Sequence, residues 1–561
     1  MKLGPRRTLL PALALAFLAF PAAGQTVTVT TAADDVDVDW QTATITDLPG
    51  PDGKVSLSEA LIAANNTPGH QTIGFAVPQE EWTLQFLLPG RAVFTALTGF
   101  YWRANDEVTI DGTTQTAFTG DTNPDGHEVA LYGNELYLNA DNCTLIGFDS
   151  TFVSLSGSNG VIEGNTGSMN IDLFGGGGSL IKDNEVGTIK IDRSSNNVVV
   201  GNVASRVRVQ GWDPVAANNR IGGPAPEDRN IIYGYGSYNS EGIPSGHAIQ
   251  LFYTQGTVIQ NNWIGTADGL TIGNLACTIG ISIETQNDDV LIQDNLISGI
   301  YGLGIGPHYP GTVWGRSMLV SGNGSGLTIT GNVIGPDING DPTLGGAWGL
   351  DFGDPVTHPL SMTGIVVSDN EIAGHILNGV TVGRNTGAVR LAGNSIHDNG
   401  WLGIDLIPSG YGYGVSPNDL LDADTGGSGV QNFPEITSVM RHGMDLTVAG
   451  ALHSSALDDF TLEFFASSVC DDSDHGEGEL PLGTLAVTTD AAGDAEFDVT
   501  LAGPVPVGWI VTATATLEPL GATSEFAACA ATCWRYEGHA LAGISGEPRL
   551  VGQGDLTSLS D

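Results

Sequence analysis

Short alternating phrases of apolar and polar residues recur along the middle of the chain, and each closes on an asparagine. Residues 256–266 read GTVIQNNWIGT, in which Val258 and Ile259 lead into Asn261-Asn262 before the apolar run resumes. Similar phrases occupy residues 290–297, 327–334, 365–372 and 389–396. Alternation over so few residues, closed by turn-forming side chains, predicts short β-strands that stop at tight turns.

The phrase-ending asparagines define a repeat. They are Asn165, Asn184, Asn202, Asn262, Asn295, Asn332, Asn370 and Asn394. The shortest separations, 19 and 18 residues, predict a unit of about 20 residues. Separations of 33 to 38 fit one unit plus an insertion, and the separation of 60 fits three units.

A second kind of short strand lies between these phrases, at residues 246–251, 280–284, 302–306, 379–383 and 402–406. Two or three strands in each short unit are typical of a parallel β-helix. One unit cannot bury its apolar side alone, so units stack and the core forms between them.

Stacking also explains the asparagines. Neighbouring coils lie about 4.8 Å apart, the spacing of adjacent strands. Asparagine tolerates the left-handed conformation of a tight turn, and its amide can donate to one coil while accepting from the other. We therefore expect a structural ladder of asparagines and no chemistry from them.

Different patterns flank the repeats. Residues 56–66, SLSEALIAANN, predict a helix with a capping box of Ser56 and Glu59, placed to cover the open end of the stack. After residue 430, five to seven alternating strands predict a small β-sandwich. The first residues have a basic start, an apolar core from Leu9 to Phe20 and a small-residue cleavage site, which predict an export signal.

The predicted fold is all-β: a right-handed parallel β-helix with an N-terminal capping helix and a C-terminal β-sandwich. The predicted divisions are a signal peptide at 1–24, an N-terminal cap at 25–107, the β-helix at 108–430, the sandwich at 431–533 and a tail at 534–561.

Several stretches support this by resemblance. Residues 52–75, DGKVSLSEALIAANNTPGHQTIGF, resemble the CSLREA segment of exported bacterial β-helix proteins, although Val55 and Ser58 replace the motif's cysteine and arginine. Residues 219–232 and 258–269 resemble the Asn/Gly repeats of right-handed β-helices, and residues 402–436 and 460–529 resemble the exit coil and sandwich that often follow. The resemblance implies an architecture and little about activity.

The net charge of the chain limits the classes of partner that the protein is expected to bind. The net charge is −44, and loss of the three signal-peptide cations leaves −47. Such a field repels nucleic acid, anionic lipid and polyanionic polysaccharide, and suits divalent cations or neutral glycans; it can also serve solubility alone. No later stretch is apolar enough to span a membrane. We expect a secreted or cell-surface protein, soluble and monomeric.

Five cysteines cannot all pair within one chain. Cys143 and Cys277 sit in apolar phrases and are expected to be buried thiols. Cys470, Cys529 and Cys533 cluster late in the chain, and in an oxidising compartment one disulfide from this trio, Cys470–Cys529, is expected.

Two arrangements could carry catalysis on polysaccharide. Asp288-Asp289 is a carboxylate pair, as glycoside hydrolysis requires, but its order relative to Gly246-His247 is reversed from that of polygalacturonases and no Arg-x-Lys follows. Lys190 and Arg208, with Lys182 and Arg206 nearby, could stack on adjacent coils and hold an acidic sugar. Turn capping and an ordinary solvated face are the alternatives.

The metal candidate is NDLLDADTG at 418–426. Asn418, Asp419, Asp422 and Asp424 offer alternating hard oxygen ligands in a loop ended by Gly426, as Ca²⁺ prefers. A plain acidic turn is the alternative.

The favoured function is non-catalytic adhesion or glycan binding at the cell surface or in the extracellular matrix. Trp212, Tyr233, Tyr235 and Tyr238 in the inserted loops could stack on sugars or simply cover the coil. The alternative is a polysaccharide lyase, glycosidase or epimerase whose site is assembled from separate coils.

Overall fold

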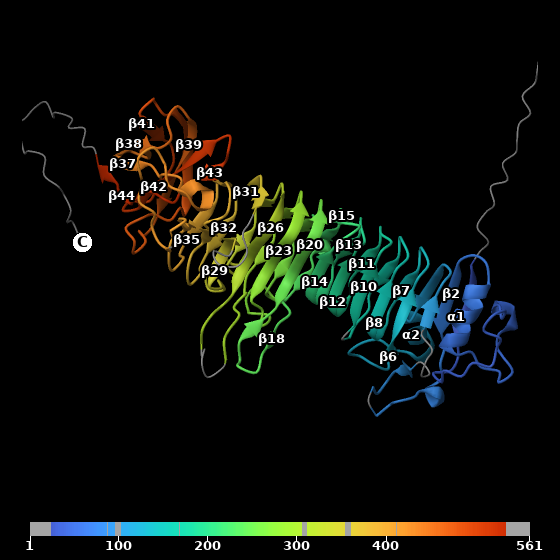
Figure 1. Cartoon of the computed structure of the whole chain (residues 1–561). Coiled ribbons are helices and arrows are strands. Elements are labelled where there is room, and N and C mark those ends of the chain that lie inside the picture. Colours follow the sequence, from blue (N-terminus) through green and yellow to red (C-terminus); the bar gives the residue numbers. More distant parts are fainter. Residues whose placement is uncertain are drawn as a thin grey trace, which may run out of the picture.

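The computed structural model describes residues 24–534, apart from residues 87, 96–101, 168, 306–310, 354–360 and 411. The expected signal peptide, up to residue 23, and the expected tail, beyond residue 534, lie outside these residues. The described chain is all-β, with long parallel sheets followed by two smaller, mainly antiparallel ones (Figure 1).

The longest sheet has 13 strands, all parallel. In order across the sheet they are β1 (Gln25–Val29), β2 (Gln71–Phe75), β5 (Val108–Asp111), β7 (Thr144–Ile146), β9 (Val161–Glu163), β11 (Leu180–Lys182), β13 (Val198–Val200), β16 (Arg220–Gly222), β21 (Val258–Gln260), β24 (Leu291–Gln293), β27 (Thr328–Thr330), β31 (Ile365–Ser368) and β34 (Val389–Ala392).

A second row of longer parallel strands accompanies the first. It comprises β4 (Trp102–Ala104), β6 (Val129–Leu138), β8 (Asp149–Leu155), β10 (Asn170–Phe174), β12 (Glu185–Asp192), β14 (Val203–Gln210), β20 (His247–Gln255), β23 (Ile279–Asp288), β26 (Arg316–Ser325), β29 (Trp348–Phe352), β33 (Val380–Val382) and β36 (Ile404–Leu406). At its margins, β3 (Ala92–Phe94) pairs with β6, β15 (Ala216–Ala217) with β20 and β30 (Ser361–Thr363) with β26.

A third row begins beside the first residues of β14. It comprises β17 (Ile231–Ile232), β22 (Trp263–Ile264), β25 (Leu296–Ile297), β28 (Val333–Ile334), β32 (Glu371–Ala373) and β35 (Ser395–His397). A separate hairpin, β18 (Ser237–Tyr238) with β19 (Pro244–Ser245), rises from the insertion before β20.

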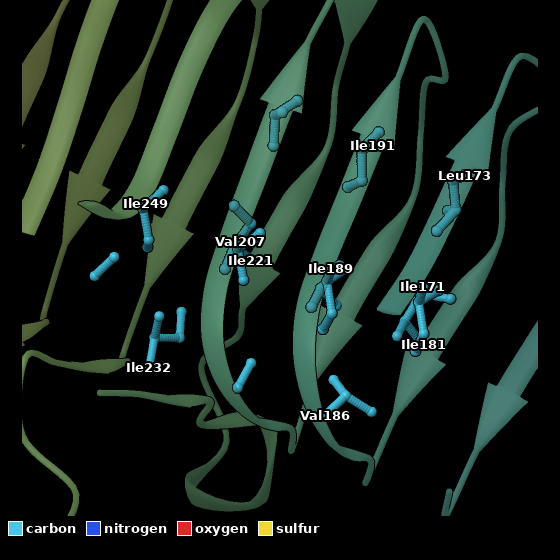
Figure 2. Packing of buried hydrophobic residues seen from close by; sticks show 14 of the residues in the cluster. Ile171, Leu173, Ile181, Val186, Ile189, Ile191, Val207, Ile221, Ile232 and Ile249 are labelled. Carbon is cyan, nitrogen blue, oxygen red and sulfur yellow. The ribbon is translucent and has the colours of Figure 1, made fainter. Parts of the chain in front are cut away.

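The core lies between these rows and is built from stacked side chains of one kind. Ile171, Ile189, Val207 and Ile249 are register partners on four successive strands, and each is fully buried (Figure 2). Each such side chain contributes about 1.5–3 kcal/mol relative to exposure, so stability accumulates along the stack.

The helix α1 (Leu57–Asn66) is present as the sequence predicts. Ser56 accepts a hydrogen bond from the Glu59 amide at 3.2 Å, and the Glu59 carboxylate accepts one from the Ser56 amide at 2.9 Å. Its apolar face packs into the same core as β1 and β4. A second helix, α2 (Thr113–Thr119), was not expected, since its threonine-rich sequence has no apolar periodicity. The short 3₁₀ turns are Ile45–Asp47, Gln79–Glu81, Pro226–Asp228 and Gly427–Val430.

The asparagines form a continuous buried ladder. In each rung the side-chain amide donates to Oδ1 of the next asparagine, as from Asn184 to Asn202 at 2.9 Å and from Asn262 to Asn295 at 3.0 Å. The same Oδ1 also accepts the backbone amide of the preceding rung, and the amide nitrogen also donates to backbone carbonyls. These side chains therefore join coils and are enclosed.

Two details of the predicted ladder are wrong. The separation of 60 residues between Asn202 and Asn262 holds one intermediate rung, Asn230, so it spans two coils and not three. The left-handed conformation belongs to the residue before the rung, as at Asp183 (φ 55°) and Gly201 (φ 67°), because the rung itself must point inward. Arg229, before Asn230, has φ −61° and so gives no turn signal.

One predicted strand is also misplaced. Residues 302–305 form no strand; Leu303 makes only an isolated antiparallel bridge with Val313. The second row of strands continues instead through β26. Because residues 321–325 at the end of β26 are glycines and polar residues, the apolar residues at its start did not stand out as a strand in the sequence. The glycine-rich phrase is an inserted loop.

The C-terminal part contains two sheets around a separate apolar core. One has the order β41 (Asp494–Leu501), β38 (Asp445–His453), β37 (Glu435–His442) and β45 (Cys533–Trp534). The other comprises β40 (Leu480–Thr488), β39 (Asp459–Ser467), β42 (Ile510–Glu518), β43 (Ala522–Thr523) and β44 (Ala530–Ala531).

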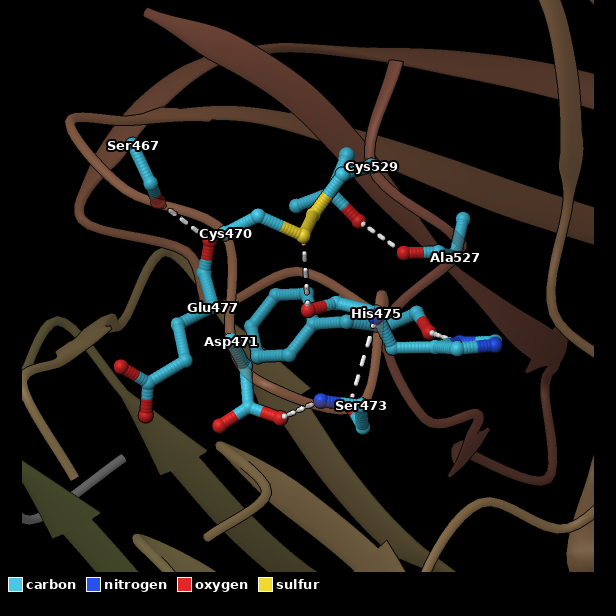
Figure 3. Close-up of a disulfide and its surroundings, with 10 residues drawn as sticks. Ser467, Cys470, Asp471, Ser473, His475, Glu477, Ala527 and Cys529 are labelled. Carbon is cyan, nitrogen blue, oxygen red and sulfur yellow. Dashed lines mark hydrogen bonds between the residues drawn. A yellow bond between two sulfur atoms is a disulfide. The ribbon is translucent and has the colours of Figure 1, made fainter. Parts of the chain in front are cut away.

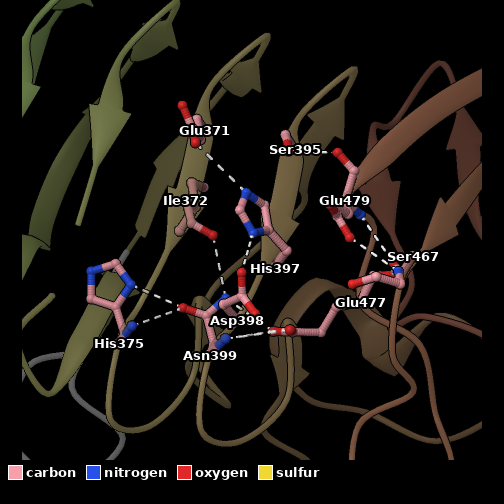
Figure 4. A network of polar contacts seen from close by, with 11 residues as sticks. Glu371, Ile372, His375, Ser395, His397, Asp398, Asn399, Ser467, Glu477 and Glu479 are labelled. Atoms are coloured by element: carbon pink, nitrogen blue, oxygen red, sulfur yellow. Dashed lines mark hydrogen bonds and ion pairs between the residues drawn. The ribbon is translucent and has the colours of Figure 1, made fainter. Parts of the chain in front are cut away.

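Acidic side chains from these sheets cover the last coil of the parallel stack. The backbone amides of Gly393 and Leu406 each donate to a carboxylate at 2.9 Å, Glu463 and Glu525 respectively. Asn399 donates to Glu477 from its side-chain amide at 3.0 Å (Figure 4). The edge that another coil would occupy is therefore hydrogen-bonded to the C-terminal sheets.

Candidate functional site

The structure separates the two sets of catalytic candidates. Lys190 and Arg208 are register partners, so they do stack on adjacent strands. Arg208 is aligned through Gln250 with Ser282, whereas Asp288 lies six residues further along β23. At about 3.3 Å per residue, that distance is about 20 Å, so these groups do not share a site.

Asp288 and Asp289 occupy a turn. Asp288 accepts hydrogen bonds from Ser325 at 3.1 Å and Gln286 at 3.3 Å, and Asp289 has φ 53°. Both contacts stay within the strand end and its neighbour. The pair has the geometry of a capped turn.

His397, a lone imidazole in the sequence, lies between two carboxylates (Figure 4). Its Nδ1 is 2.8 Å from Asp398 and its Nε2 is 3.7 Å from Glu371. Burial lowers its pKa, but these acidic partners outweigh burial and raise the pKa to about 9. A charged, doubly paired imidazole is a poor general base at neutral pH. His308 lies outside the described residues.

The metal candidate is a compact carboxylate group. Oxygens of Asp419, Asp422 and Asp424 lie within 4.8 Å of one another. Burial, together with the charges of Asp424 and Asp419, raises the pKa of Asp422 to about 6. Carboxylates that converge in this way can hold a hard cation such as Ca²⁺ once they are ionised.

Asn418 does not join this group through its side chain. Its amide donates to the Phe433 carbonyl at 2.9 Å and its Oδ1 accepts the Phe433 amide at 2.9 Å. These bonds tie the loop to the first segment of the C-terminal part. The expected fourth ligand thus serves to hold the loop.

The loop aromatics do not form one platform. Tyr233 accepts a hydrogen bond from Ser205 at 3.1 Å, and Tyr235 lies over Arg206 at 4.8 Å. Trp212, 71% exposed, packs edge-on against Tyr253. Tyr238 belongs to the β18–β19 hairpin.

The cysteines divide into one bond and three thiols. Cys470 and Cys529 form a disulfide, 59 residues apart in sequence (Figure 3). Cys143 and Cys277 are buried free thiols, and Cys533 is exposed. The disulfide anchors the loop that begins at Asp471, whose carboxylate accepts the Ser473 amide at 2.7 Å.

That loop borders a cavity of about 480 Å³ where the last coils meet the C-terminal sheets. This cavity is here called the junction pocket, and its size is that of a small-ligand site. It is lined by Asn378, Gly400, Trp401, Leu402, Tyr413, Gly414, Asp471, Asp472 and Ser473.

Aromatic and polar groups meet in the junction pocket. Trp401 and Tyr413 are 47% and 53% exposed, with ring centroids 6.1 Å apart. Asn378, fully buried, donates to Asp405 at 2.7 Å, while its Oδ1 has no hydrogen-bond partner. Burial raises the pKa of Asp405 to about 6. The pocket thus offers ring faces beside the carboxylates of Asp471 and Asp472.

A second cavity, here called the lateral groove, runs along the third row of strands, with a volume of about 450 Å³. Its floor includes Trp263 and Val333, and Arg229 lies over the Trp263 ring at 4.8 Å. Asp294, Asp337 and Glu371 also line it.

No family model matches this chain, and no curated protein matches it either. Function is therefore argued from the site alone.

The sequence reasoning missed the junction pocket. Its groups come from residues 378, 401, 413 and 471–473, which no local pattern connects. The available signal was two aromatics, Trp401 just before the segment that resembles an exit coil and Tyr413 within it.

Proposed function

We propose that this protein is an exported, right-handed parallel β-helix protein that binds glycans and does not cleave them. In this proposal α1 caps the start of the helix and the C-terminal sheets form a sandwich at its other end. The resemblance of residues 52–75 to CSLREA segments and the repeated strand rows support that architecture.

The observation that carries glycan binding is the junction pocket. Sugars present C–H faces that pack on aromatic rings and hydroxyls that pair with amides and carboxylates. Trp401 and Tyr413 offer the first surface, and Asp471 and Asp472 the second. Among the described residues, no helix is long and apolar enough to cross a bilayer.

Ca²⁺ at Asp419, Asp422 and Asp424 would be structural. Asp422 accepts the Asn432 amide at 2.8 Å, so a cation there would tie the exit loop to the start of the C-terminal sheets. We expect nucleic acid to be excluded by the acidic field, and the protein to act as a monomer.

The test is a panel of purified neutral, amino and acidic polysaccharides, with and without Ca²⁺, in which retention and release of reducing ends are scored separately. Retention of at least one glycan without cleavage supports the proposal. Turnover of any glycan, or absence of retention across the panel, contradicts it.

A second function, glycoside hydrolysis, is favoured by the three carboxylates of the lateral groove. Asp337 is committed to its own loop, since its Oδ1 accepts the Asn339 amide at 2.8 Å and the Asp341 amide at 3.0 Å. Asp294, which accepts a hydrogen bond from Gln260 at 3.5 Å, and Glu371, 3.7 Å from the His397 imidazole, are the two carboxylates left for the roles of acid and base. If the panel reveals cleavage, Asp294→Asn and Glu371→Gln must abolish it.

A further inference from the structure

Two arginines on β14 lack the acidic partners that other arginines of this chain have. Arg206 and Arg208 share one face of the strand, two residues apart. Neither guanidinium has a carboxylate oxygen within 4.0 Å or a hydrogen-bond acceptor in the described part of the chain, and the Nε of each is buried without a partner. Two arginines without a carboxylate partner are unexpected in a chain with 63 acidic and 19 basic residues.

Two other arginines of the chain stack on an aromatic ring and also pair with an aspartate. Arg193 lies over Phe174 at 4.3 Å and also bonds Asp192 at 3.2 Å. Arg316 lies over Trp348 at 4.7 Å and also bonds Asp351 at 2.7 Å.

Arg206 and Arg208 have only the aromatic half of that arrangement. Tyr235 lies 4.8 Å from the Arg206 guanidinium, and Phe252 lies 4.9 Å from that of Arg208. A ring fixes the plane of a guanidinium but accepts none of its hydrogen bonds in the plane. The donors are therefore positioned and unused.

A third donor lies on the next strand, where His247 stands two residues before Ile249, the register partner of Val207. His247, on the next strand of the row, has a buried Nδ1 without a hydrogen-bond partner, and its nearest carboxylate, Glu284, is 4.0 Å away. Burial lowers the pKa of His247; the Glu284 carboxylate raises it, and the charges of Arg206 and Arg208 lower it.

Neighbouring acids are already engaged. Asp192 pairs with Lys190 at 3.0 Å and accepts from Gln210 at 2.7 Å. Glu284 accepts a hydrogen bond from Ser282. Lys190 is therefore neutralised, whereas the two arginines are not.

We propose that Arg206, Arg208 and His247 form a binding site for one oxyanion, the carboxylate or sulfate group of an acidic saccharide. Two guanidinium groups and an imidazole supply donors to several oxygens of one group, and charge-assisted bonds of this kind are the strong ones. The acidic field of the whole chain disfavours long polyanions, so the ligand carries isolated anionic groups. This site is separate from the junction pocket.

The experiment titrates the full mature chain with sodium sulfate, glucuronic acid and glucose at constant ionic strength, measured by calorimetry. We expect saturable binding of sulfate and glucuronate, and none of glucose. Arg206→Gln and Arg208→Gln together must weaken both by at least about tenfold.

The matched control is Arg193→Gln, an arginine that is stacked on a ring but already paired with Asp192. It must leave sulfate and glucuronate binding unchanged. Circular dichroism melting checks that each variant is folded; Arg206→Lys and Arg208→Lys, which keep the charge, replace the Gln variants if those unfold.

Absence of saturable sulfate and glucuronate binding overturns the oxyanion site, as does equal loss in the control. Sulfate binding without glucuronate binding overturns the saccharide source and leaves a site for free inorganic anion. Because small anions are used, failure here is distinguishable from failure of the glycan panel at the junction pocket.

Discussion

The side-chain amide of Asn202 donates to Oδ1 of Asn230 at 3.0 Å, joining two coils whose rungs are 28 residues apart in sequence. Asn230 in turn donates to Asn262 at 2.9 Å and to the Val199 carbonyl at 2.8 Å. One buried amide thus satisfies groups on both neighbouring coils.

Replacing that amide should be costly. Asn230→Ala leaves the Asn202 backbone amide without its acceptor, removes one of three acceptors of the Asn202 side-chain amide and takes a donor from the Val199 carbonyl. Each unsatisfied buried group costs about 1–3 kcal/mol. We expect the free energy of unfolding, measured with urea, to fall by about 3 kcal/mol or more. Asn385→Ala, at an exposed position, should change it by less than about 0.5 kcal/mol. Equal effects of the two substitutions would contradict a ladder that bears on stability.

The ladder asparagines also show which parts of this fold can be predicted from local sequence patterns. Alternation and turn residues are local, so the strands and eight of the rungs could be predicted from them. Asn230 was missed because Arg229 precedes it where the other rungs have glycine, aspartate or asparagine.

The junction pocket could not be predicted in the same way. Trp401 and Asp472 come together only when the C-terminal sheets dock on the last coil, and docking depends on contacts between distant segments. The aspartates of the metal candidate, in contrast, lie within six residues, and the structure places three of the four expected side chains together.

Glycan retention should depend on Trp401. Trp401→Ala removes the larger ring face of the junction pocket, and we expect affinity for the retained glycan to fall about three- to tenfold, measured by calorimetry. Trp212→Ala, which removes a more exposed indole elsewhere, should leave it unchanged. Loss of affinity in Trp212→Ala alone would contradict binding at the junction pocket and indicate that the glycan binds at the inserted loop that carries Trp212.

Calcium should stabilise the exit loop. We expect added Ca²⁺ to raise the melting temperature, EGTA to reverse the rise, and Asp422→Asn to abolish it. Because Asp422 has a pKa of about 6 and must be ionised to bind a cation, the rise should shrink below pH 6. Asp445→Asn, at an exposed position, serves as the control. A rise that persists in Asp422→Asn would contradict this site.

The attachment of the C-terminal sheets should weaken as pH rises. Burial raises the pKa of Glu525 from 4.5 to about 8. A carboxyl whose folded pKa is raised contributes stability that is present below the unfolded pKa and lost as pH rises through the folded pKa. From pH 5 to pH 8 the loss is about 3 kcal/mol for this group, and Glu477, with a pKa raised by burial to about 7, adds to it.

Glu525→Gln should therefore flatten the decline in urea stability between pH 5 and pH 8, since an amide does not titrate. Glu496→Gln, on the exposed side of β41, should leave the decline as it is. An unchanged slope in Glu525→Gln would show that the general acidity of the chain, and not this carboxyl, sets the pH dependence.

The acidic side chains that bind the last coil also limit the association of two molecules of this protein through the ends of their parallel sheets. A stack of parallel strands ends in a row of free amides and carbonyls, onto which another chain can add by the same hydrogen bonds. Within the same chain, Glu463 and Glu525 accept the backbone amides of Gly393 and Leu406 on the last coil, and Glu477 accepts the backbone and side-chain amides of Asn399. End-to-end polymerisation into fibres is thereby blocked at this end, which lets a repeating architecture remain a particle of fixed length.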